Sequence, residues 1–130
     1  MKILLIGGSG VIGSYFVKTL LKEKYDLVYT YYKNKIISSH AIYLDVQDRL
    51  STIETIKKIN PEIVLICNAL TGVDLCEENP LLTDSINVKG TQNIVDGCKL
   101  SNSKLIFIST SAVFDGTKDE YFENDVPNPT

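Results

Sequence analysis

The stretch "LLIGGSGVIGSYF", residues 4–16, decides the fold of this chain. An apolar run ends at Gly7, and further glycines follow at positions 10 and 13. A tight turn from a strand into a helix needs a glycine that tolerates an unusual φ. A second glycine lets the backbone approach a diphosphate, and a third lets the helix pack closely on the strand. The stretch therefore predicts a strand–turn–helix unit with a phosphate site at the start of the helix.

Outward from this turn, short apolar runs alternate with longer segments of helical spacing. The predicted strands, each buried on both faces, are residues 2–6, 27–32, 41–44, 62–67 and 104–108. The helical stripes comprise Ile12, Phe16 and Leu20; Ile53, Ile56 and Ile59; and Leu82, Ile86, Gly90, Ile94 and Cys98. The alternation predicts an α/β fold with a doubly wound parallel sheet of the Rossmann type. In that setting the glycine turn predicts dinucleotide binding, and Gly90 allows its helix to lie close to the sheet.

Composition narrows the class of protein. The chain has 130 residues, is 44% hydrophobic and carries a net charge of −3, which suits one domain and no basic surface. Nucleic acid and anionic membranes are therefore not expected as partners. The apolar runs are too short to cross a bilayer, and the first one ends without a cleavage site, so we expect a cytoplasmic protein. The three cysteines lack metal-site spacing, so we expect reduced, mostly buried thiols and no metal site.

The end of the second predicted strand bears on the choice of dinucleotide. An acidic residue at this place would bind the adenosine ribose and repel a 2′-phosphate. Residues 30–33, Thr-Tyr-Tyr-Lys, include no carboxylate. NADP is therefore favoured, with NAD as the alternative. Lys33 is the candidate ligand of the 2′-phosphate, although a solvated loop describes Lys33 and Lys35 equally well.

Three further segments resemble a known family. They are "NALTGVDLCEENP" (68–80), "NVKGTQNI" (87–94) and "ISTSAVFDG" (108–116). Together with the Gly-x-x-Gly-x-x-Gly spacing, they resemble the extended short-chain dehydrogenases/reductases over essentially the whole chain. Within that family, the chain looks most like the dTDP-4-dehydrorhamnose reductase group. The resemblance implies an NADP-dependent enzyme that reduces a keto group on a nucleotide-activated sugar, and it allows a homodimer.

The resemblance and the fold together define a predicted cofactor site. Its residues are Gly7, Gly10, Val11, Ile12, Gly13, Lys33, Asp45, Val46, Asn68, Ala69 and Leu70. The resemblance places the adenine near Asp45 and Val46, although a helix N-cap or a turn would also explain the aspartate. Residues 68–70 follow the fourth predicted strand, at the carboxyl edge where ligands of such sheets bind. Asn87 matches a family asparagine that supports a proton relay, with a helix-surface asparagine as the competing interpretation.

The family resemblance also predicts the reacting groups. The family uses a strand-end hydroxyl, a tyrosine acid, and a lysine that lowers the pKa of that tyrosine. Alignment of "VF" places the hydroxyl on Thr110; Ser109 and Ser111 adjoin it, and strand-end capping is the alternative. The pairs Tyr29–Lys33 and Tyr31–Lys35 have the spacing of the family's catalytic Tyr-x-x-x-Lys. Both lie at the end of the second predicted strand, on the adenosine side of the cofactor, which is the wrong place for the catalytic pair.

The segment "ENDVPNP", residues 123–129, fits the family stretch that precedes the catalytic tyrosine. We therefore expect residues 1–130 to be a cofactor-binding domain that ends before its Tyr-x-x-x-Lys and its substrate domain. Two alternatives to the reductase stay open. One is an epimerase or dehydratase of the same family, and the other is a non-catalytic, dinucleotide-binding regulatory subunit.

Overall fold

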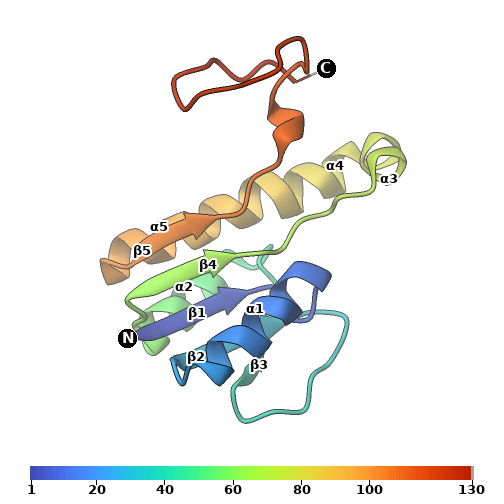
Figure 1. The fold of residues 1–130 in the computed structure, drawn as a ribbon. Helices are drawn as coiled ribbons and strands as arrows, with labels where there is room; N and C mark the ends of the chain where they lie inside the picture. Colours follow the sequence, from blue (N-terminus) through green and yellow to red (C-terminus); the bar gives the residue numbers. More distant parts are fainter. Residues whose placement is uncertain (130) are drawn as a thin grey trace.

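A computed structural model describes residues 1–129 and shows the predicted alternation of strands and helices (Figure 1). The strands are β1 (Lys2–Ile6), β2 (Asp26–Tyr31), β3 (Ala41–Tyr43), β4 (Ile63–Ile66) and β5 (Lys104–Phe107). The helices are α1 (Val11–Lys22), α2 (Arg49–Ile59), α3 (Val73–Glu78), α4 (Pro80–Thr83), the π-helix η1 (Asp84–Gly90), α5 (Thr91–Ser101) and the 3₁₀ turn η2 (Ser111–Val113). Within residues 1–129, none of these helices has the length and apolarity that a bilayer span requires.

The five strands form one parallel sheet in the order β3-β2-β1-β4-β5. The chain moves outward from β1 to β3, then returns to the other side of β1 with β4 and continues to β5. This reversal next to β1 makes the sheet doubly wound, as predicted. In such sheets a crevice opens at the carboxyl ends of the strands where the order reverses, so the topology already locates a site.

Successive residues of β1 point to opposite faces and build two cores. Ile3 and Leu5 face α1, in a cluster with Leu27, Tyr29 and Leu65. The second cluster lies beneath α2 and α5 and contains Leu4, Ile6, Leu44, Val46, Ile56, Val64, Ile66, Ile94 and Cys98. Helices on both faces therefore bury the central strands, which explains why their sequences are continuously apolar.

Local signals delimit the helices that cover the second core. The Asp48 carboxylate accepts a hydrogen bond from the Ser51 amide at 3.0 Å and so caps the start of α2. Asn60 closes the same helix in the left-handed conformation, with φ of 48°. On the helix run from α4 through α5, a Cβ at Gly90 would lie 2.7 Å from Val46 Cγ2. The predicted close approach is thus real, but its contact is Val46, in the loop after β3.

Several expectations about burial were wrong, among them those for β5 and for the start of α1. The last strand was expected to be buried on both faces, yet all four residues of β5 are exposed, including Phe107 at 52%. As an edge strand, β5 has a neighbour on one side only within residues 1–129, and α5 packs chiefly on α2. Ile12 was placed in the buried stripe of α1 but is 52% exposed. It lies in the first turn of α1, and neither core cluster includes it.

Candidate functional site

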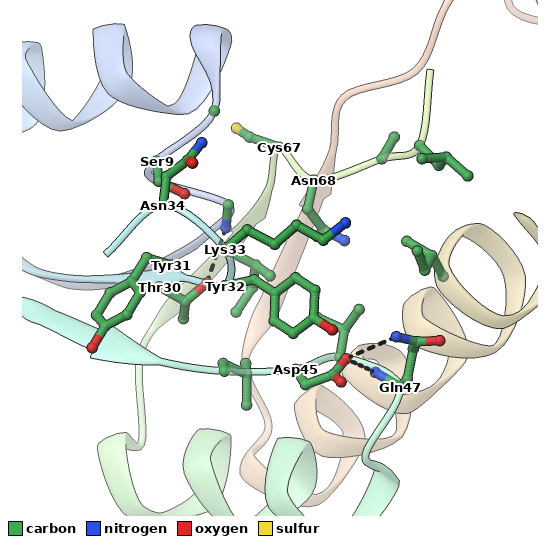
Figure 2. Close-up of a pocket in the computed structure, with 18 residues that line it drawn as sticks. Ser9, Thr30, Tyr31, Tyr32, Lys33, Asn34, Asp45, Gln47, Cys67 and Asn68 are labelled. Carbon is green, nitrogen blue, oxygen red and sulfur yellow. Dashed lines mark hydrogen bonds between the residues drawn. The ribbon is translucent and has the colours of Figure 1, made fainter. Parts of the chain in front are cut away.

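A cleft with a volume of about 290 Å³ lies at the carboxyl ends of the strands, beside the start of α1 (Figure 2). Eight of the predicted cofactor residues line it: Gly7, Gly10, Lys33, Asp45, Val46, Asn68, Ala69 and Leu70. The cleft thus brings together segments that follow β1, β2, β3 and β4. Parallel strands end at one edge of a sheet, which explains why residues so distant in the sequence meet here.

The glycine turn has the tight geometry that its spacing predicts. Gly7 has a φ of +88°, a value that side chains with a Cβ rarely adopt. A Cβ at Gly7 would lie 2.8 Å from the Asn68 backbone nitrogen, and one at Gly13 would lie 2.1 Å from the Gly7 oxygen. The backbone of the turn therefore packs closely on itself and on the segment after β4, and Gly7, Ser9 and Gly10 line the cleft just before α1 begins.

The turn is also held by β2. The Gly7 amide donates to Thr30 Oγ1 at 3.0 Å, and the Gly8 amide donates to the Thr30 carbonyl oxygen at 2.8 Å. Thr30 is buried, with both its hydroxyl and its backbone engaged. The amides that begin a helix have no acceptors within that helix, and they carry the positive end of its dipole. Val11 and Ile12 are the first two residues of α1, so their predicted contact with phosphate is through the backbone.

The end of β2 contributes aromatic rings and a cation. The Lys33 side chain extends over the cleft toward Asn68, and the Tyr32 ring lies beneath it (Figure 2). The rings of Tyr31 and Tyr32 each have their centroids 6.0 Å from that of Tyr43. Both tyrosines and Asn34 line the cleft but were not predicted as site residues. Their place at the same strand end as Lys33 was the available signal.

Asp45 makes a turn and does not cap a helix. Its Oδ1 accepts hydrogen bonds from the Gln47 backbone at 3.0 Å and from Gln47 Nε2 at 3.2 Å. The cap of α2 is Asp48, three residues later. The N-cap alternative considered for Asp45 was therefore wrong, the turn is observed, and the predicted adenine contact stays a prediction. Gln47 also lines the cleft, and no sequence pattern pointed to it.

Two asparagines belong to the wall of the cleft that follows β4: Asn68 lines it, and Asn87 supports it from behind. The Oδ1 atom of Asn68 is buried and has no hydrogen-bond partner among residues 1–129. Buried amide oxygens without a partner are uncommon and call for an explanation. Asn87, from η1, holds the backbone of Leu70 with both ends of its side-chain amide. In this structure Asn87 is therefore neither a solvated surface residue nor a group that lines the cleft.

Thr110 follows β5 and lies outside the lining of the cleft. Its Oγ1 accepts a hydrogen bond from the Ala112 amide at 3.2 Å and caps η2. The capping alternative therefore describes the contact seen. A hydroxyl can donate while it accepts, so the cap leaves the Thr110 proton available to another acceptor.

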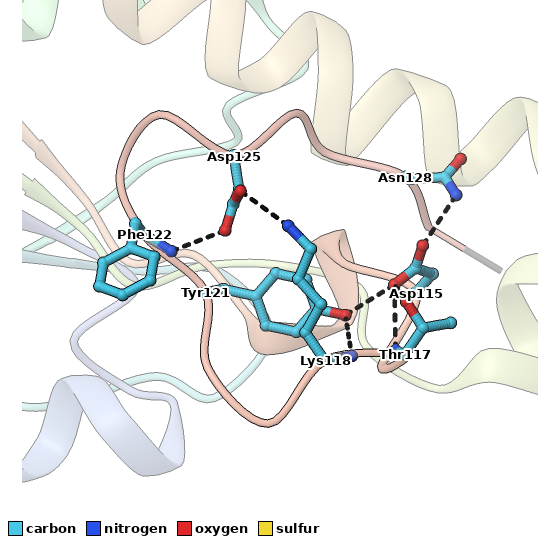
Figure 3. A network of polar contacts seen from close by, with 7 residues as sticks. All are labelled: Asp115, Thr117, Lys118, Tyr121, Phe122, Asp125 and Asn128. Atoms are coloured by element: carbon cyan, nitrogen blue, oxygen red, sulfur yellow. Dashed lines mark hydrogen bonds and ion pairs between the residues drawn. The ribbon is translucent and has the colours of Figure 1, made fainter.

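The segment after η2 is a loop, and it is organised by Asp115 (Figure 3). The Asp115 carboxylate accepts hydrogen bonds from the Tyr121 hydroxyl at 2.6 Å, from the amide and hydroxyl of Thr117, and from Asn128 Nδ2. The bond from Tyr121, followed by those from Thr117 and Asn128, holds the pKa of Asp115 well below its ordinary value. The backbone amide of Asn128 donates to the Val113 carbonyl oxygen at 2.9 Å. The loop therefore closes on itself next to the segment that carries Thr110.

Comparisons with known proteins agree with this geometry. The family model described as the RmlD substrate binding domain matches residues 1–130. The probable low-salt glycan biosynthesis reductase of Haloferax volcanii is 28% identical over 99% of this chain and 44% of its own length. The methionine adenosyltransferase 2 subunit beta of Xenopus tropicalis is 26% identical over 97% of this chain and 37% of its own length.

Solved structures that superpose on this chain include reductases and an epimerase. A hypothetical dTDP-4-dehydrorhamnose reductase from Sulfolobus tokodaii superposes with a TM-score of 0.89 at 33% identity, over 99% of this chain and 46% of that one. The Brucella ovis UDP-glucose 4-epimerase in complex with NAD superposes with a TM-score of 0.84 at 28% identity, over 99% of this chain and 42% of that one. The Bacillus anthracis dTDP-4-dehydrorhamnose reductase in complex with NADP superposes with a TM-score of 0.81 at 27% identity, over 98% of this chain and 43% of that one.

The chain therefore spans less than half the length of these relatives. Its match to the family model nonetheless extends over every residue, and the sheet order and glycine turn described above are consistent with that match. The relatives include proteins named as reductases and epimerases of nucleotide-linked sugars. The chain belongs to the RmlD substrate binding domain family, and its doubly wound parallel sheet is a Rossmann fold.

Proposed function

We propose that this chain supplies the dinucleotide-binding part of an NADP-dependent reductase that acts on a keto group of a nucleotide-activated sugar. The observation that carries the proposal is the turn from Gly7 to Gly13. A Cβ at Gly7 would collide with the Asn68 backbone after β4, a Cβ at Gly13 would collide with the Gly7 backbone, and the turn leads into α1 beside the cleft. This arrangement suits a diphosphate, which needs close backbone approach and unpaired helix amides.

Other residues of the cleft suit the remaining parts of the cofactor. The buried, unpartnered Oδ1 of Asn68 is an acceptor for a hydroxyl, such as those of a ribose. Lys33 is a cation for a 2′-phosphate. NADPH, when bound, supplies the hydride. Thr110 would donate a hydrogen bond from its hydroxyl to the carbonyl oxygen of the substrate, where negative charge develops, while the tyrosine acid would supply the proton. The tyrosine acid and its lysine are expected beyond Thr130.

Binding measurements test the choice of dinucleotide. The full chain is expected to bind NADPH more tightly than NADH, because Lys33 faces the cleft and no carboxylate ends β2. Lys33→Ala should lower the NADPH affinity about tenfold and leave NADH nearly unchanged, since one charge-assisted contact is lost. Titrations that follow the fluorescence of the reduced nicotinamide measure both affinities. Lys35→Ala, two residues away, is the control and should change neither.

The outcomes of this titration separate the candidate functions. Tight binding of NADPH together with NADPH-dependent reduction of a nucleotide-linked keto sugar supports the reductase. Binding without turnover of any sugar nucleotide would instead favour a regulatory subunit, a reading that the similarity to a methionine adenosyltransferase subunit beta supports. A preference for NADH together with interconversion of UDP-glucose would favour an epimerase.

Cysteine reactivity tests whether the cofactor occupies the cleft. Cys67 lines the cleft, and burial raises the pKa of its thiol. We expect saturating NADPH to slow alkylation of Cys67 by iodoacetamide at least tenfold, because the bound molecule covers it. Cys76 lies outside the cleft and should react at the same rate with or without NADPH. Mass spectrometry of the alkylated peptides gives both rates.

Cys98 provides an internal control in the same experiment. It is buried, and burial raises the pKa of its thiol to about 11. At pH 8 only about one thiol in a thousand would be ionised, so Cys98 should stay unmodified while the protein is folded. Equal protection of Cys67 and Cys76 would indicate a general stabilisation and would argue against occupancy of the cleft.

A further inference from the structure

Three consecutive residues of η1 contact the cleft and both of its walls. Ile86 lines the cleft itself. On one side of it, Ser85 Oγ donates a hydrogen bond to Gln47 Oε1 at 2.8 Å. On the other side, Asn87 Oδ1 accepts from the Leu70 amide at 2.8 Å, and Asn87 Nδ2 donates to the Leu70 carbonyl oxygen at 2.9 Å. One turn of helix thus reaches the loop after β3 and the segment after β4.

The wall after β3 is held at several points. Gln47, which accepts from Ser85, donates in turn to Asp45. Farther along the same helix run, buried Asn93 donates from Nδ2 to the Val46 carbonyl oxygen at 2.9 Å. Gly90 lies against the Val46 side chain. The loop 45–47 therefore takes its position from the helix that begins with η1.

The wall after β4 depends on Asn87. Residues 67–72 have no regular secondary structure, so no strand ladder or helix pairs the backbone of Leu70. The Asn87 amide offers one donor and one acceptor to it, as a neighbouring strand would. The thiol of Cys76 adds a weak hydrogen bond to the Leu70 carbonyl oxygen at 3.4 Å. Of these contacts, only Asn87 engages both backbone groups of Leu70.

The π-helical geometry of η1 makes this double contact compatible with the packing of α5. A π turn contains an extra residue compared with an α turn. Without that residue, Ser85 and Asn87 would be rotated by about 100° relative to Gly90 and Asn93. Their side chains would then point away from the two loops while α5 kept its place on the core.

We infer that Ser85 and Asn87 are positioning residues that set the separation of the two cleft walls, Ser85 for the adenosine end of a bound dinucleotide and Asn87 for the nicotinamide end. The assignment of ends follows from the sheet order, because the diphosphate site lies after β1, with β3 on one side and β4 on the other. The inference rests on the proposed dinucleotide function. It does not depend on whether NADPH or NADH is preferred.

The test uses the full chain and two ligands: the dinucleotide that the wild-type protein binds, and its adenosine half, which is 2′,5′-ADP for NADPH or ADP for NADH. Asn87→Ala should weaken the whole dinucleotide about tenfold, since two hydrogen bonds are lost, and the adenosine half less than twofold. Ser85→Ala should weaken both ligands by the same factor. Asn79→Ala is the control and should change neither, because Asn79 is exposed between α3 and α4 and its side-chain amide bonds only the Leu75 carbonyl oxygen of α3.

Hydrogen exchange gives a second measurement that needs no ligand. In Asn87→Ala, the Leu70 amide should exchange faster, while the Cys67 amide, bonded to the Ile6 carbonyl oxygen, should keep its rate. Equal losses for the whole dinucleotide and the adenosine half, or faster exchange throughout β4, would show a general structural role and overturn the inference. So would unchanged affinities in Asn87→Ala. If the wild-type chain binds no dinucleotide, the proposed function fails, and exchange at Leu70 alone decides whether Asn87 holds this wall.

Discussion

Gly13→Ala is expected to destabilise the protein by about 3 kcal/mol or more. The added Cβ would lie 2.1 Å from the Gly7 carbonyl oxygen and 3.0 Å from the Gly8 Cα. Both are backbone atoms in a turn that hydrogen bonds to Thr30 already hold, so they cannot move aside without shifting α1. Denaturant unfolding followed by circular dichroism measures the change in the free energy of unfolding.

Gly72→Ala is the matched control for this substitution. At Gly72 a Cβ would lie 3.4 Å from Leu75 Cβ, an ordinary van der Waals contact, and the backbone φ is −71°. We expect a change of less than about 1 kcal/mol. If Gly13→Ala were as stable as Gly72→Ala, the close packing of α1 on the backbone of Gly7 and Gly8 would be refuted.

Ile56→Ala is expected to cost about 2–5 kcal/mol of stability. The Ile56 side chain is fully buried in the core beneath α2 and α5. It also fits against the backbone of Gly97, where a Cβ would lie 2.7 Å from Ile56 Cδ1. Truncation would leave a cavity between two helices whose separation this contact sets. The same unfolding measurement applies.

Leu50→Ala, on the same helix, separates burial from helix propensity. Leu50 is 73% exposed, so its truncation removes little buried surface. Leucine and alanine have similar helix propensities, and we expect a change within about 0.5 kcal/mol. Equal effects at the two positions would contradict the assignment of α2 as a helix that packs through Ile56.

Much of the site could be predicted because parallel strands end at one edge. Once the apolar runs were taken as parallel strands, the residues after each run had to meet, and Asp45, Asn68 and Leu70 do line one cleft with Gly7. Gln47 and Ile86 were missed. Gln47 enters through a turn built on Asp45, and Ile86 enters from a helix. Neither depends on a strand end.

Contacts between elements were beyond prediction for a related reason. The bond from Ser85 to Gln47 joins residues 38 apart in the chain, and those from Asn87 to Leu70 join residues 17 apart. Which side chain of a helix faces which loop depends on the rotation of that helix. Here a π segment changes the rotation partway along, and the stripe of apolar residues does not reveal it. The same stripe placed Leu82 in the core, although it is exposed.

The sequence by itself determined the order of strands and helices, the turn at Gly7 to Gly13 and the absence of an acid after β2. Each of these depends on neighbouring residues or on the spacing of apolar residues, which is two in strands and three to four in helices. The tertiary structure decided the exposure of β5, the turn at Asp45, and the hold of Ser85 and Asn87 on the two walls. These depend on the mutual rotation and spacing of packed elements. Packing of whole side chains sets that arrangement, and no local pattern encodes it.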